Sequence, residues 1–463
     1  MNTPRSHCVA VIDVGKTNVK VIVVNAAGET LAQRTVLNEV ERTGPYPHFD
    51  VQAIFEWVVT GLTTFAKEYP IDTIIPVTHG ATGVLWDGEG LALPVLDYEF
   101  EGLTEIDSEY LLAASDFRNT CSPKLPNGLN FGKQLFWLKR RFPEKFARAT
   151  QILMYPQYFA LHLTGQLHSE VTSLGCHTDL WEPEQKCFSK FCVNEGFASK
   201  FPALRSAYAS AGALLPQMVR RTGLDPNVRV LTGIHDSNAS YFAYAAPRQA
   251  QAQFAVVSTG TWVVCMAKGV GLAGLREELD MLANVDAFGD PVASARFMGG
   301  REYEVLAGSD GLLAQPTLLD LEHVLETALP LPCFSSQGGP FRESKGQIIG
   351  QAPQTPTGRA ALAALYAALM TDHCLRSLRV AGDVIVDGPF AKNPLFASVL
   401  AGLRPTQSVF FADAAAAGTA RGAAQLAAWP TSLSIRFTPV EGQFTEKLQA
   451  YRERWYAALP VRR

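Results

Sequence analysis

A strand, a glycine turn and a second strand follow one another twice in this chain, once near the start of each half. The first copy lies in the stretch VIDVGKTNVKVIVV. Its segments Val9–Asp13 and Asn18–Val24 favour strands, because β-branched side chains are stiff and pack well on a pleated surface. Gly15 predicts a tight turn between them, and Thr30–Leu37 is expected to be a third strand. The sequence therefore predicts a β-meander at the N-terminus.

The first copy also contains Gly15-Lys16-Thr17, the three letters that close a P-loop. A P-loop needs another glycine five positions earlier and a helix afterwards. The earlier position is Ala10, and the residues after Thr17 favour a strand. A hairpin can still bind phosphate, because a glycine turn exposes backbone N–H groups and Lys16 and Thr17 add donors. The alternative is an ordinary hairpin with polar turn residues.

The second copy lies at Phe254–Cys265 and has the same form. Asp13 aligns with Ser258, and Gly15 aligns with Gly260. Repeated structure of this kind predicts two lobes of related topology, each with a glycine turn that can face the other. The alternative is chance similarity between two hairpins, which are common elements.

Composition narrows the class of protein. The 463 residues are 47% hydrophobic and 18% charged, enough for two or three domains with a large core. The net charge is −4, and no basic block suggests binding to nucleic acid or to a membrane surface. The first residues, Met1–His7, lack the apolar core of a signal peptide, and no apolar segment is long enough to span a bilayer.

The eight cysteines are scattered along the chain. Only Cys187 and Cys192 lie close together, and no second pair with metal-ligand spacing follows. This pattern favours reduced thiols in a cytoplasmic protein, buried as structural residues, and argues against a zinc site.

The middle of the chain alternates helix-like and strand-like segments. We expect helices at Val51–Glu68, Asn127–Arg141 and Ser237–Tyr244, and strands at Thr73–Thr78 and Arg229–Gly233.

The last hundred residues have the clearest periodicity. Alternation of strands with helices predicts an α/β layer with a parallel part, and ligands bind at the carboxyl ends of such strands. Gly388 and Asp236 follow expected strands in this way. The expected elements are helices at Ala360–Val380, at Pro394–Leu403 with Asn393 as its cap, and at Ala414–Trp429, with strands at Asp383–Asp387 and Val409–Phe411.

Five stretches of the sequence, taken together and in their order along the chain, resemble the motifs of the FGGY family of carbohydrate kinases. The resemblance covers nearly the whole chain. Smaller similarities are Lys133 with Trp137, the Leu163–Gly165 turn, and Glu170-x-Thr172. The five resemble the family's first phosphate motif, catalytic segment, second phosphate motif, adenosine motif and small-residue helix. They are Asp13-x-Gly15-x-Thr17-Asn18-x-Lys20, Gly233-x-His235-Asp236, Ser258-Thr259-Gly260-Thr261, Asp387-Gly388 through Asn393-Pro394, and Ala417-Gly418 through Gly422-Ala423-Ala424.

The resemblance implies an α/β fold of two ribonuclease-H-like (actin-like ATPase) domains flanking a central cleft that holds ATP and a small-molecule sugar. It implies an N-terminal sugar-binding lobe over 1–246, carrying the first phosphate motif and the catalytic aspartate. A C-terminal nucleotide-binding lobe is expected over 247–463. A homodimer is a further family-level expectation.

The chemistry of phosphoryl transfer requires the same residue types, whether or not the chain resembles this family. The reaction depends mostly on positioning the reactants and on neutralising their charge. Glycine turns let backbone N–H groups approach phosphate oxygens. Mg²⁺ prefers carboxylates and waters, so Asp13 is the expected metal residue, acting through water. The residues expected to bind nucleotide are Asp13, Gly15, Lys16, Thr17, Asn18, Lys20, Thr259, Gly260, Thr261, Gly388 and Asn393.

The attacking hydroxyl needs a base or an orienting carboxylate, and the resemblance assigns this role to Asp236. The alternative is a helix N-cap after a strand. His79 and Asp97 match the places where the family holds sugar hydroxyls, and His235 and Asp236 complete the expected sugar site. For His79 and Asp97 the alternative is a solvated surface residue, and Trp137 is more often core than a sugar platform.

Three positions depart from the family pattern. Glu99 stands where an Arg is common, Pro389 replaces the second glycine of the adenosine motif, and Lys16 replaces Thr or Ser. Lys16 and the Gly-Ile-His-Asp segment resemble the rhamnulose/fuculose kinase branch, which favours a 6-deoxy-ketohexose such as L-fuculose or L-rhamnulose. The alternatives are another ketose or polyol (xylulose, ribulose or glycerol).

Two further classes are a non-catalytic sugar sensor and an actin-like ATPase. A sensor is expected to carry a DNA-binding module and to lose Asp13 or Asp236, and neither holds for this sequence. The placement of Asp236 and the similarities to a sugar site argue against an actin-like ATPase, although fold analogy alone does not separate these classes.

Overall fold

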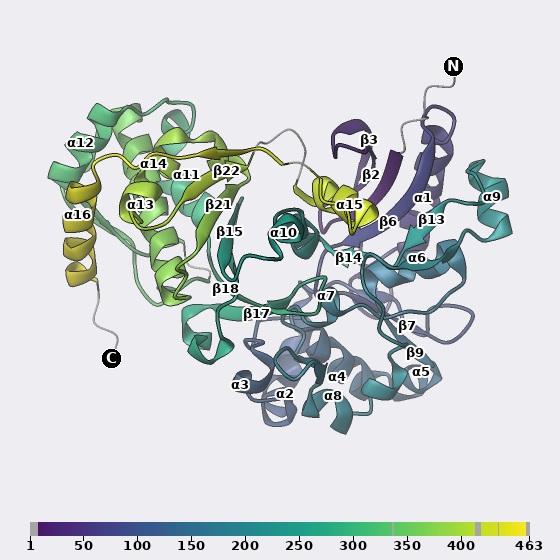
Figure 1. Cartoon of the computed structure of the whole chain (residues 1–463). Coiled ribbons are helices and arrows are strands. Elements are labelled where there is room, and N and C mark those ends of the chain that lie inside the picture. Colours follow the sequence, from purple (N-terminus) through teal and green to yellow (C-terminus); the bar gives the residue numbers. More distant parts are fainter. Residues whose placement is uncertain (1–7, 336–337, 413–417, 434, 460–463) are drawn as a thin grey trace, which may run out of the picture. The chain divides into compact units, whose positions relative to one another are not determined.

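The structure is a computed structural model that describes residues 8–335, 338–412, 418–433 and 435–459. The chain divides into two compact units, each with its own main sheet (Figure 1). The first unit comprises Met1–Gln249, Ala283–Pro291 and Ala415–Ser434. The second comprises Ala250–Leu282, Val292–Ala414 and Ile435–Arg463.

The main sheet of the first unit joins an antiparallel meander to parallel strands. Its strands are β1 (Cys8–Val14), β2 (Asn18–Asn25), β3 (Thr30–Leu37), β6 (Ile71–Thr78), β12 (Ser210–Ala213), β13 (Arg229–Leu231) and β14 (Ile234–His235). The order is β12-β13-β6-β1-β2-β3, with β14 beside β6. β1, β2 and β3 are antiparallel neighbours, whereas β6 is parallel to β1, β13 and β14.

The main sheet of the second unit repeats this topology. Its strands include β15 (Phe254–Thr259), β16 (Val263–Lys268), β18 (Pro291–Phe297), β21 (Asp383–Asp387), β22 (Val409–Ala412) and β23 (Phe437–Pro439). β18, β16 and β15 form the antiparallel meander, and β21 and β22 continue in parallel from β15. β23 ends the sheet antiparallel to β22, as β12 does beside β13. The two related lobes predicted from the repeated hairpin are therefore confirmed.

Helices cover both sheets. Those of the first unit that pack on its sheet are α1 (Val51–Phe65), α6 (Tyr155–Thr164), α9 (Pro216–Thr222), α10 (Asp236–Ala245) and α15 (Gly418–Ala428). The second unit contains α11 (Gly299–Gly311), α12 (Leu318–Thr327), α13 (Pro356–Ser377), α14 (Pro394–Leu403) and α16 (Thr445–Ala458). Between β6 and β12 the first unit adds short elements. They are β7 (Gly83–Trp86), β8 (Val95–Leu96), α2 (Asp107–Ala113), α3 (Phe117–Thr120), α4 (Phe131–Arg141), α5 (Pro143–Arg148), β9 (Gln151–Met154), α7 (Val171–Leu174) and α8 (Lys190–Asn194).

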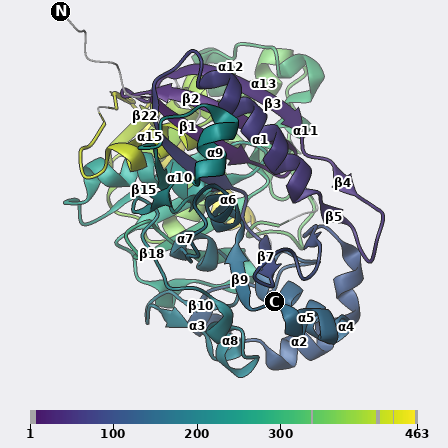
Figure 2. The same cartoon turned by 90° about the vertical axis from the view of Figure 1, so that its right-hand side faces the viewer.

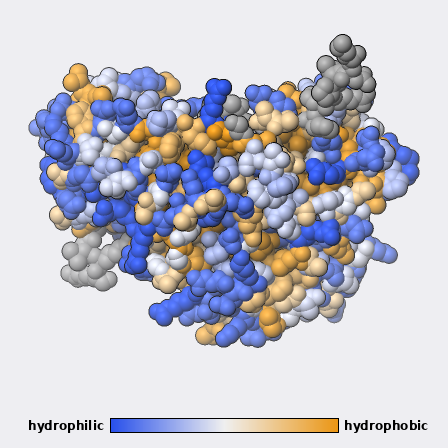
Figure 3. All heavy atoms as spheres, in the orientation of Figure 1, coloured by the Kyte–Doolittle hydropathy of each residue, from blue (hydrophilic) through white to orange (hydrophobic). Residues whose placement is uncertain are grey.

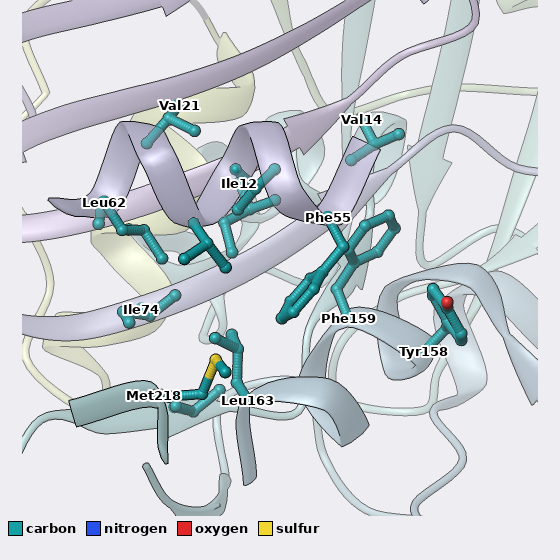
Figure 4. Packing of buried hydrophobic residues seen from close by; sticks show 14 of the residues in the cluster. Ile12, Val14, Val21, Phe55, Leu62, Ile74, Tyr158, Phe159, Leu163 and Met218 are labelled. Carbon is teal, nitrogen blue, oxygen red and sulfur yellow. The ribbon is translucent and has the colours of Figure 1, made fainter. Parts of the chain in front are cut away.

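Strands β1 and β2 bury side chains on both faces, which is why they are continuous apolar runs in the sequence. On one face, Ile12 and Val21 pack with Leu62 of α1 (Figure 4). Figure 2 shows α1 and α9 side by side over this face. On the other face, Val11 and Ile22 pack with residues of α10 and α15. Successive side chains alternate between the faces, so both sets need apolar partners.

Most predicted elements agree with the structure to within a few residues. The expected hairpins, the strand Asp383–Asp387 and the helix Pro394–Leu403 are all present. Asn393 caps that helix, because its side chain accepts a hydrogen bond from the N–H of Phe396. Of the helix expected at Ala414–Trp429, residues 414–417 lie outside the described residues, and α15 occupies Gly418–Ala428.

The differences occur where the backbone turns. The helix expected from Asn127 begins only at Phe131, because Asn127 has a φ of 53° and the N–H of Gly128 is bonded to the carbonyl of Tyr98 at 2.8 Å. The helix expected at Val51–Glu68 ends at Phe65. The strand expected at Arg229–Gly233 ends at Leu231, since Gly233 has a φ of 91° and redirects the chain into β14. Cys187 is exposed, contrary to the expectation that every cysteine is buried.

On the face drawn in Figure 3, hydrophilic and hydrophobic residues are interspersed over the two units. Within the described ranges, no helix has both the length and the apolar character needed to cross a bilayer.

Candidate active site

The first glycine turn is closed by its own backbone and held by a residue that the motif does not include. The N–H of Gly15 donates to the carbonyl of Asn18 at 2.9 Å. Asn38, at the end of β3, donates from its side chain to the carbonyl of Gly15 at 2.8 Å and from its backbone to Thr17 at 2.8 Å. Asn38 therefore fixes the shape of the turn. Sequence reasoning missed it because its partners lie more than 20 positions away, in the turn between β1 and β2.

Asp13 lies near the end of β1, two residues before this turn, with only 8% of its surface exposed. Lys20 of β2 donates to Asp13 Oδ2 at 3.2 Å, since the two residues are opposite each other in the antiparallel register. Burial raises the pKa of the Asp13 carboxyl; the charge of Lys20 lowers it and that of Asp236 raises it. Two carboxylates therefore lie close enough to repel each other.

Asp236 is the first residue of α10 and follows β14 directly. Because β14 is parallel to β6, Asp236 lies at the carboxyl edge of the sheet, as predicted. Its Oδ1 accepts hydrogen bonds from the backbone and the hydroxyl of Ser237 at 2.5 and 3.2 Å, and lies 3.1 Å from His235 Nε2. Burial raises the pKa of Asp236, and its interaction with His79 and the bonds from Ser237 oppose that rise. His235, rather than Asp236, occupies the N-cap position.

The two expected histidines are buried and neutral at pH 7. Burial lowers the pKa of both His79 and His235 to about 4. Asn238 Nδ2 lies 3.0 Å from His235 Nδ1, so the amide donates to that nitrogen. The Nδ1 of His79 lies 2.9 Å from the carbonyl of Gly80 and donates to it. That bond leaves His79 Nε2 as an acceptor, and this buried atom has no hydrogen-bond partner among the described residues.

Lys16 does not extend as a free donor from the turn. Its Nζ bonds Asp97 Oδ1 and lies 3.2 Å from Glu99 Oε2. The same ammonium lies 5.0 Å from the centre of the Tyr98 ring and 5.1 Å from that of Phe49. Lys16 is therefore next to the residues expected to bind sugar. Phe49 and Tyr98 were not predicted as site residues, because only the tertiary structure brings them to Lys16.

The second unit contains a cavity of about 780 Å³ beside its glycine turn. Gly260, Thr261, Tyr303, Pro389 and Asn393 are among its lining residues. A volume of this order is typical of small-molecule sites. A Cβ added at Gly260 would meet nothing closer than 3.8 Å, so the turn is open to an approaching ligand.

Gly300 and Gly388 allow two other segments to approach this turn. A Cβ on Gly300, in the first turn of α11, would lie 2.2 Å from the carbonyl oxygen of Gly260. Gly388 has a φ of 88°, and a Cβ there would lie 2.1 Å from the carbonyl oxygen of Thr259. The hydroxyl of Thr259 donates to the carbonyl of Asp387 at 2.6 Å and accepts from the N–H of Phe390 at 3.0 Å. Thr259 therefore joins the turn to the loop after β21.

The structure thus gathers the predicted residues in two places. Those in the first unit are Asp13, Gly15, Lys16, Thr17, Asn18, Lys20, His79, Asp97, His235 and Asp236. Those in the second unit are Thr259, Gly260, Thr261, Gly388 and Asn393. Sequence reasoning missed Gly300 and Tyr303, whose hydroxyl accepts from Asn393 Nδ2 at 3.2 Å.

Trp137 and Lys133 belong to the packing of the first unit. Trp137 is 4% exposed, and its indole N–H donates to Glu105 at 2.5 Å. Lys133 is 2% exposed and pairs with Asp107 at 2.5 Å. Trp137 is therefore a core residue rather than a platform for sugar, as its residue type favours.

The donor set fits a loosely held Mg²⁺ ion better than a fully protein-ligated metal. Across the part of the chain that the structure describes, no three His, Cys, Asp or Glu side chains form a metal cage. Mg²⁺ usually keeps several waters and needs only one or two carboxylates. Asp13 and Asp236 are two such carboxylates, and the charge of Asp236 raises the pKa of Asp13.

Two models of one protein family match this chain, one in each half. The model of the N-terminal domain of the FGGY family of carbohydrate kinases matches residues 119–243, and that of the carbohydrate kinase FGGY C-terminal domain matches residues 251–434. The solved structure of a carbohydrate kinase from Novosphingobium aromaticivorans is 37% identical, with a TM-score of 0.90 and 98% of each chain covered.

Among curated relatives, an L-fuculokinase from Salmonella typhi is 26% identical over 275 residues, which cover 57% of this chain and 57% of the relative. A rhamnulokinase from Halalkalibacterium halodurans is 28% identical over 239 residues, covering 48% and 47%. The matches thus span about half the length of these curated relatives.

Proposed function

Since the chain belongs to the FGGY family of carbohydrate kinases, we propose that it transfers the γ-phosphoryl group of ATP to a hydroxyl of a free ketose. A 6-deoxy-ketohexose such as L-fuculose or L-rhamnulose is the favoured acceptor, supported by the similarity to an L-fuculokinase and a rhamnulokinase. The observation that carries the proposal is the position of Asp236, a carboxylate at the carboxyl edge of the first sheet. Its charge interacts with His79, whose Nε2 has no hydrogen-bond partner among the described residues.

In the proposed reaction, Asp236 orients the acceptor hydroxyl and accepts its proton. The hydroxyl oxygen forms a new bond to the γ-phosphorus, the bond between that phosphorus and the β–γ bridging oxygen breaks, and ADP leaves. General-base assistance of this kind is typically worth about 10²–10⁴ in rate. A raised pKa makes Asp236 a stronger proton acceptor than an ordinary aspartate, as long as it remains ionised.

The nucleotide half of the reaction is assigned to the second unit. Gly260 and Thr261 of the open turn line the cavity together with Tyr303 and Asn393, so their backbone N–H groups are the ones proposed to contact phosphate. Such groups stabilise phosphate oxygens without side-chain bulk. Asp13, through water, would hold Mg²⁺ with Asp236 nearby, and the charge of the ion would neutralise the phosphates when it is bound.

The acceptor half is assigned to the first unit. His79 Nε2 is a buried acceptor, and leaving such an atom unpaired costs about 1–3 kcal/mol. A sugar hydroxyl would satisfy it. We therefore assign acceptor binding and the catalytic carboxylate to residues 1–246 and nucleotide binding to residues 247–463.

A coupled assay for ADP release tests the proposal. The purified protein is incubated with Mg-ATP and, one at a time, L-fuculose, L-rhamnulose, D-xylulose, D-ribulose and glycerol. We expect ADP release that depends on the sugar and is fastest with a 6-deoxy-ketose. Faster turnover, by about tenfold in kcat/KM, with glycerol or xylulose would contradict the favoured acceptor, since it corresponds to about 1.4 kcal/mol of discrimination in the wrong direction. ADP release that does not depend on any sugar would contradict the kinase proposal.

Two finer expectations stay predictions. A homodimer would be checked by sedimentation equilibrium, and a cytoplasmic location by fractionation of the source cells.

A further inference from the structure

Lys16 and Glu99, two positions at which this chain departs from the family pattern, are in contact in the structure. Lys16 Nζ lies 3.2 Å from Glu99 Oε2 and is bonded to Asp97 Oδ1. The backbone N–H of Glu99 donates to the same Asp97 oxygen at 3.1 Å. A positive charge therefore does stand beside Asp97 and Glu99, but it comes from the turn between β1 and β2 rather than from position 99.

The aromatic rings beside Lys16 also border His79. Phe49 and Tyr98 lie 5.1 and 5.0 Å from the ammonium, measured to the ring centres. The same two rings lie 5.6 and 5.5 Å from the imidazole of His79. Apolar ring surface with a few convergent polar groups is the usual composition of a small-molecule site. Lys16 therefore belongs to the same local environment as the unpartnered nitrogen of His79.

The hydrogen-bonding capacity of this environment is incomplete. An ammonium group has three N–H donors, and the carboxylates of Asp97 and Glu99 take two of them. The Lys16 side chain is 20% exposed, and one N–H donor of its ammonium remains for a ligand. The remaining N–H of Lys16 can donate to a hydroxyl oxygen, and His79 Nε2 can accept from a hydroxyl hydrogen. Together they match the donor and acceptor of one or two sugar hydroxyl groups.

The charges around the site are unequal. Beside Lys16, the carboxylates of Asp97 and Glu99 outnumber its single ammonium group, whereas Asp13 and Asp236 are the carboxylates assigned to Mg²⁺. The region therefore has excess negative charge, which repels an acceptor that carries a carboxylate or a phosphate.

We propose that Lys16 is a specificity-determining residue for the sugar acceptor: held by Asp97 and Glu99, its ammonium donates to a hydroxyl of an uncharged sugar, and the surrounding carboxylates exclude sugar acids. This inference rests on the proposed function. It differs from the role that the sequence motif assigned to Lys16, which was contact with the phosphates of the nucleotide. Lys20, which instead pairs with Asp13, remains the lysine on the metal and phosphate side.

Kinetics of Lys16→Met tests the assignment, with Lys20→Met as the matched control from the same hairpin. Loss of a hydrogen bond from a charged donor costs about 1.5–3 kcal/mol, or about ten- to hundredfold in affinity. We expect Lys16→Met to raise the KM of the best neutral sugar by that factor and to leave the KM of ATP within about twofold. Lys20→Met should show the opposite split. A Lys16→Met variant whose ATP KM rises more than its sugar KM overturns the proposal.

Glu99→Gln provides a second test that does not depend on the folding of a Lys16 variant, because the Glu99 side chain is 64% exposed. The readout is the ratio of kcat/KM for the best neutral ketose to that for gluconate, a sugar acid. We expect the wild-type ratio to favour the ketose and Glu99→Gln to lower that ratio. A wild-type preference for gluconate, or an unchanged ratio in Glu99→Gln, overturns the charge argument. In the double variant with Lys16→Met, the effects on sugar KM should be non-additive, since the residues are in contact.

The design separates failure of this inference from failure of the proposed function. Sugar-dependent ADP release by the wild-type protein supports the kinase function whatever the variants do. If the wild type releases ADP with a sugar and Lys16→Met binds that sugar unchanged by calorimetry, the inference alone is wrong. If the wild type acts on no sugar and binds none, both are wrong.

Discussion

The backbone of His235 is bonded to the side chain of Thr172: the N–H of His235 donates to Thr172 Oγ1 at 3.1 Å. The Thr172 hydroxyl in turn donates to Glu170 Oε2 at 2.5 Å, and the backbone N–H of Thr172 donates to the same oxygen at 2.9 Å. All three residues are at most 5% exposed. The segment that presents Asp236 is therefore held from α7, which explains the Glu170-x-Thr172 similarity in chemical terms.

We predict that Thr172→Val lowers kcat by about tenfold or more and lowers the free energy of unfolding by about 1–3 kcal/mol. The valine leaves the buried N–H of His235 without its acceptor and removes one of the two bonds from Thr172 to Glu170 Oε2. The catalytic segment can then shift, and small displacements of catalytic groups cost up to about 10²-fold in rate. The control is Thr164→Val, because the Thr164 hydroxyl is also buried with two hydrogen bonds, to Ala160 and from Gln166. It should lose stability without losing kcat. Equal losses of kcat in the two variants would show that Thr172 is only structural.

Glu170 should make stability depend on pH in the opposite sense to an ion-paired carboxylate. Burial raises the pKa of Glu170 to about 7 from an ordinary 4.5. Between these values the folded chain binds the proton more tightly than the unfolded chain, so the contribution of Glu170 to stability falls as pH rises from 4.5 through 7. The change is about 3 kcal/mol.

Glu170→Gln removes this titration and keeps an amide oxygen for Thr172. We expect the stability of the variant relative to the wild type, measured as the difference in the free energy of unfolding, to be about 3 kcal/mol greater at pH 8 than at pH 4.5. Urea unfolding of both proteins at the two pH values measures this difference. The same difference at both values would contradict the raised pKa.

Asp236→Asn tests the catalytic base. We expect kcat to fall by about 10²–10⁴, with the affinity for ATP retained. In the wild type, kcat should fall as pH drops through the raised pKa of Asp236, because the protonated carboxyl accepts no proton; this acid limb should be absent from the residual activity of the variant. Asp225→Asn, at an exposed loop aspartate, is the control and should match the wild type. An unchanged acid limb in Asp236→Asn would assign the base elsewhere.

Gly260→Val tests the phosphate turn. Because a Cβ at Gly260 has open space around it, the substitution should fold normally and obstruct only a ligand that approaches the turn. We expect calorimetry to show weaker binding of Mg-ATP. Gly274→Val, at another glycine with nothing within 4 Å of its Cβ, should bind ATP as the wild type does. Equal ATP affinity in both variants would remove the turn from the nucleotide site.

Local chemistry was enough to predict many elements of the fold. The continuous β-branched apolar runs of β1 and β2, the glycine turns and the cap at Asn393 depend on residues a few positions apart, and their steric preferences act in any context. The predicted first residue of the helix that begins at Phe131 was wrong, because the start of this helix depends on a hydrogen bond between Gly128 and the distant Tyr98. The exposure of Cys187 likewise depends on packing that no local pattern encodes.

The sequence by itself determined the two related sheets, the place of Asp236 at a strand end and the family to which the chain belongs, because these follow from short-range periodicity and from motifs in order. Only the tertiary structure decided that Lys16 contacts Asp97 and Glu99, and that His79 keeps a buried nitrogen without a partner. These facts depend on which segments the strand register brings together. Ionic and hydrogen-bonding contacts form over a few ångströms in space, whatever their separation along the chain.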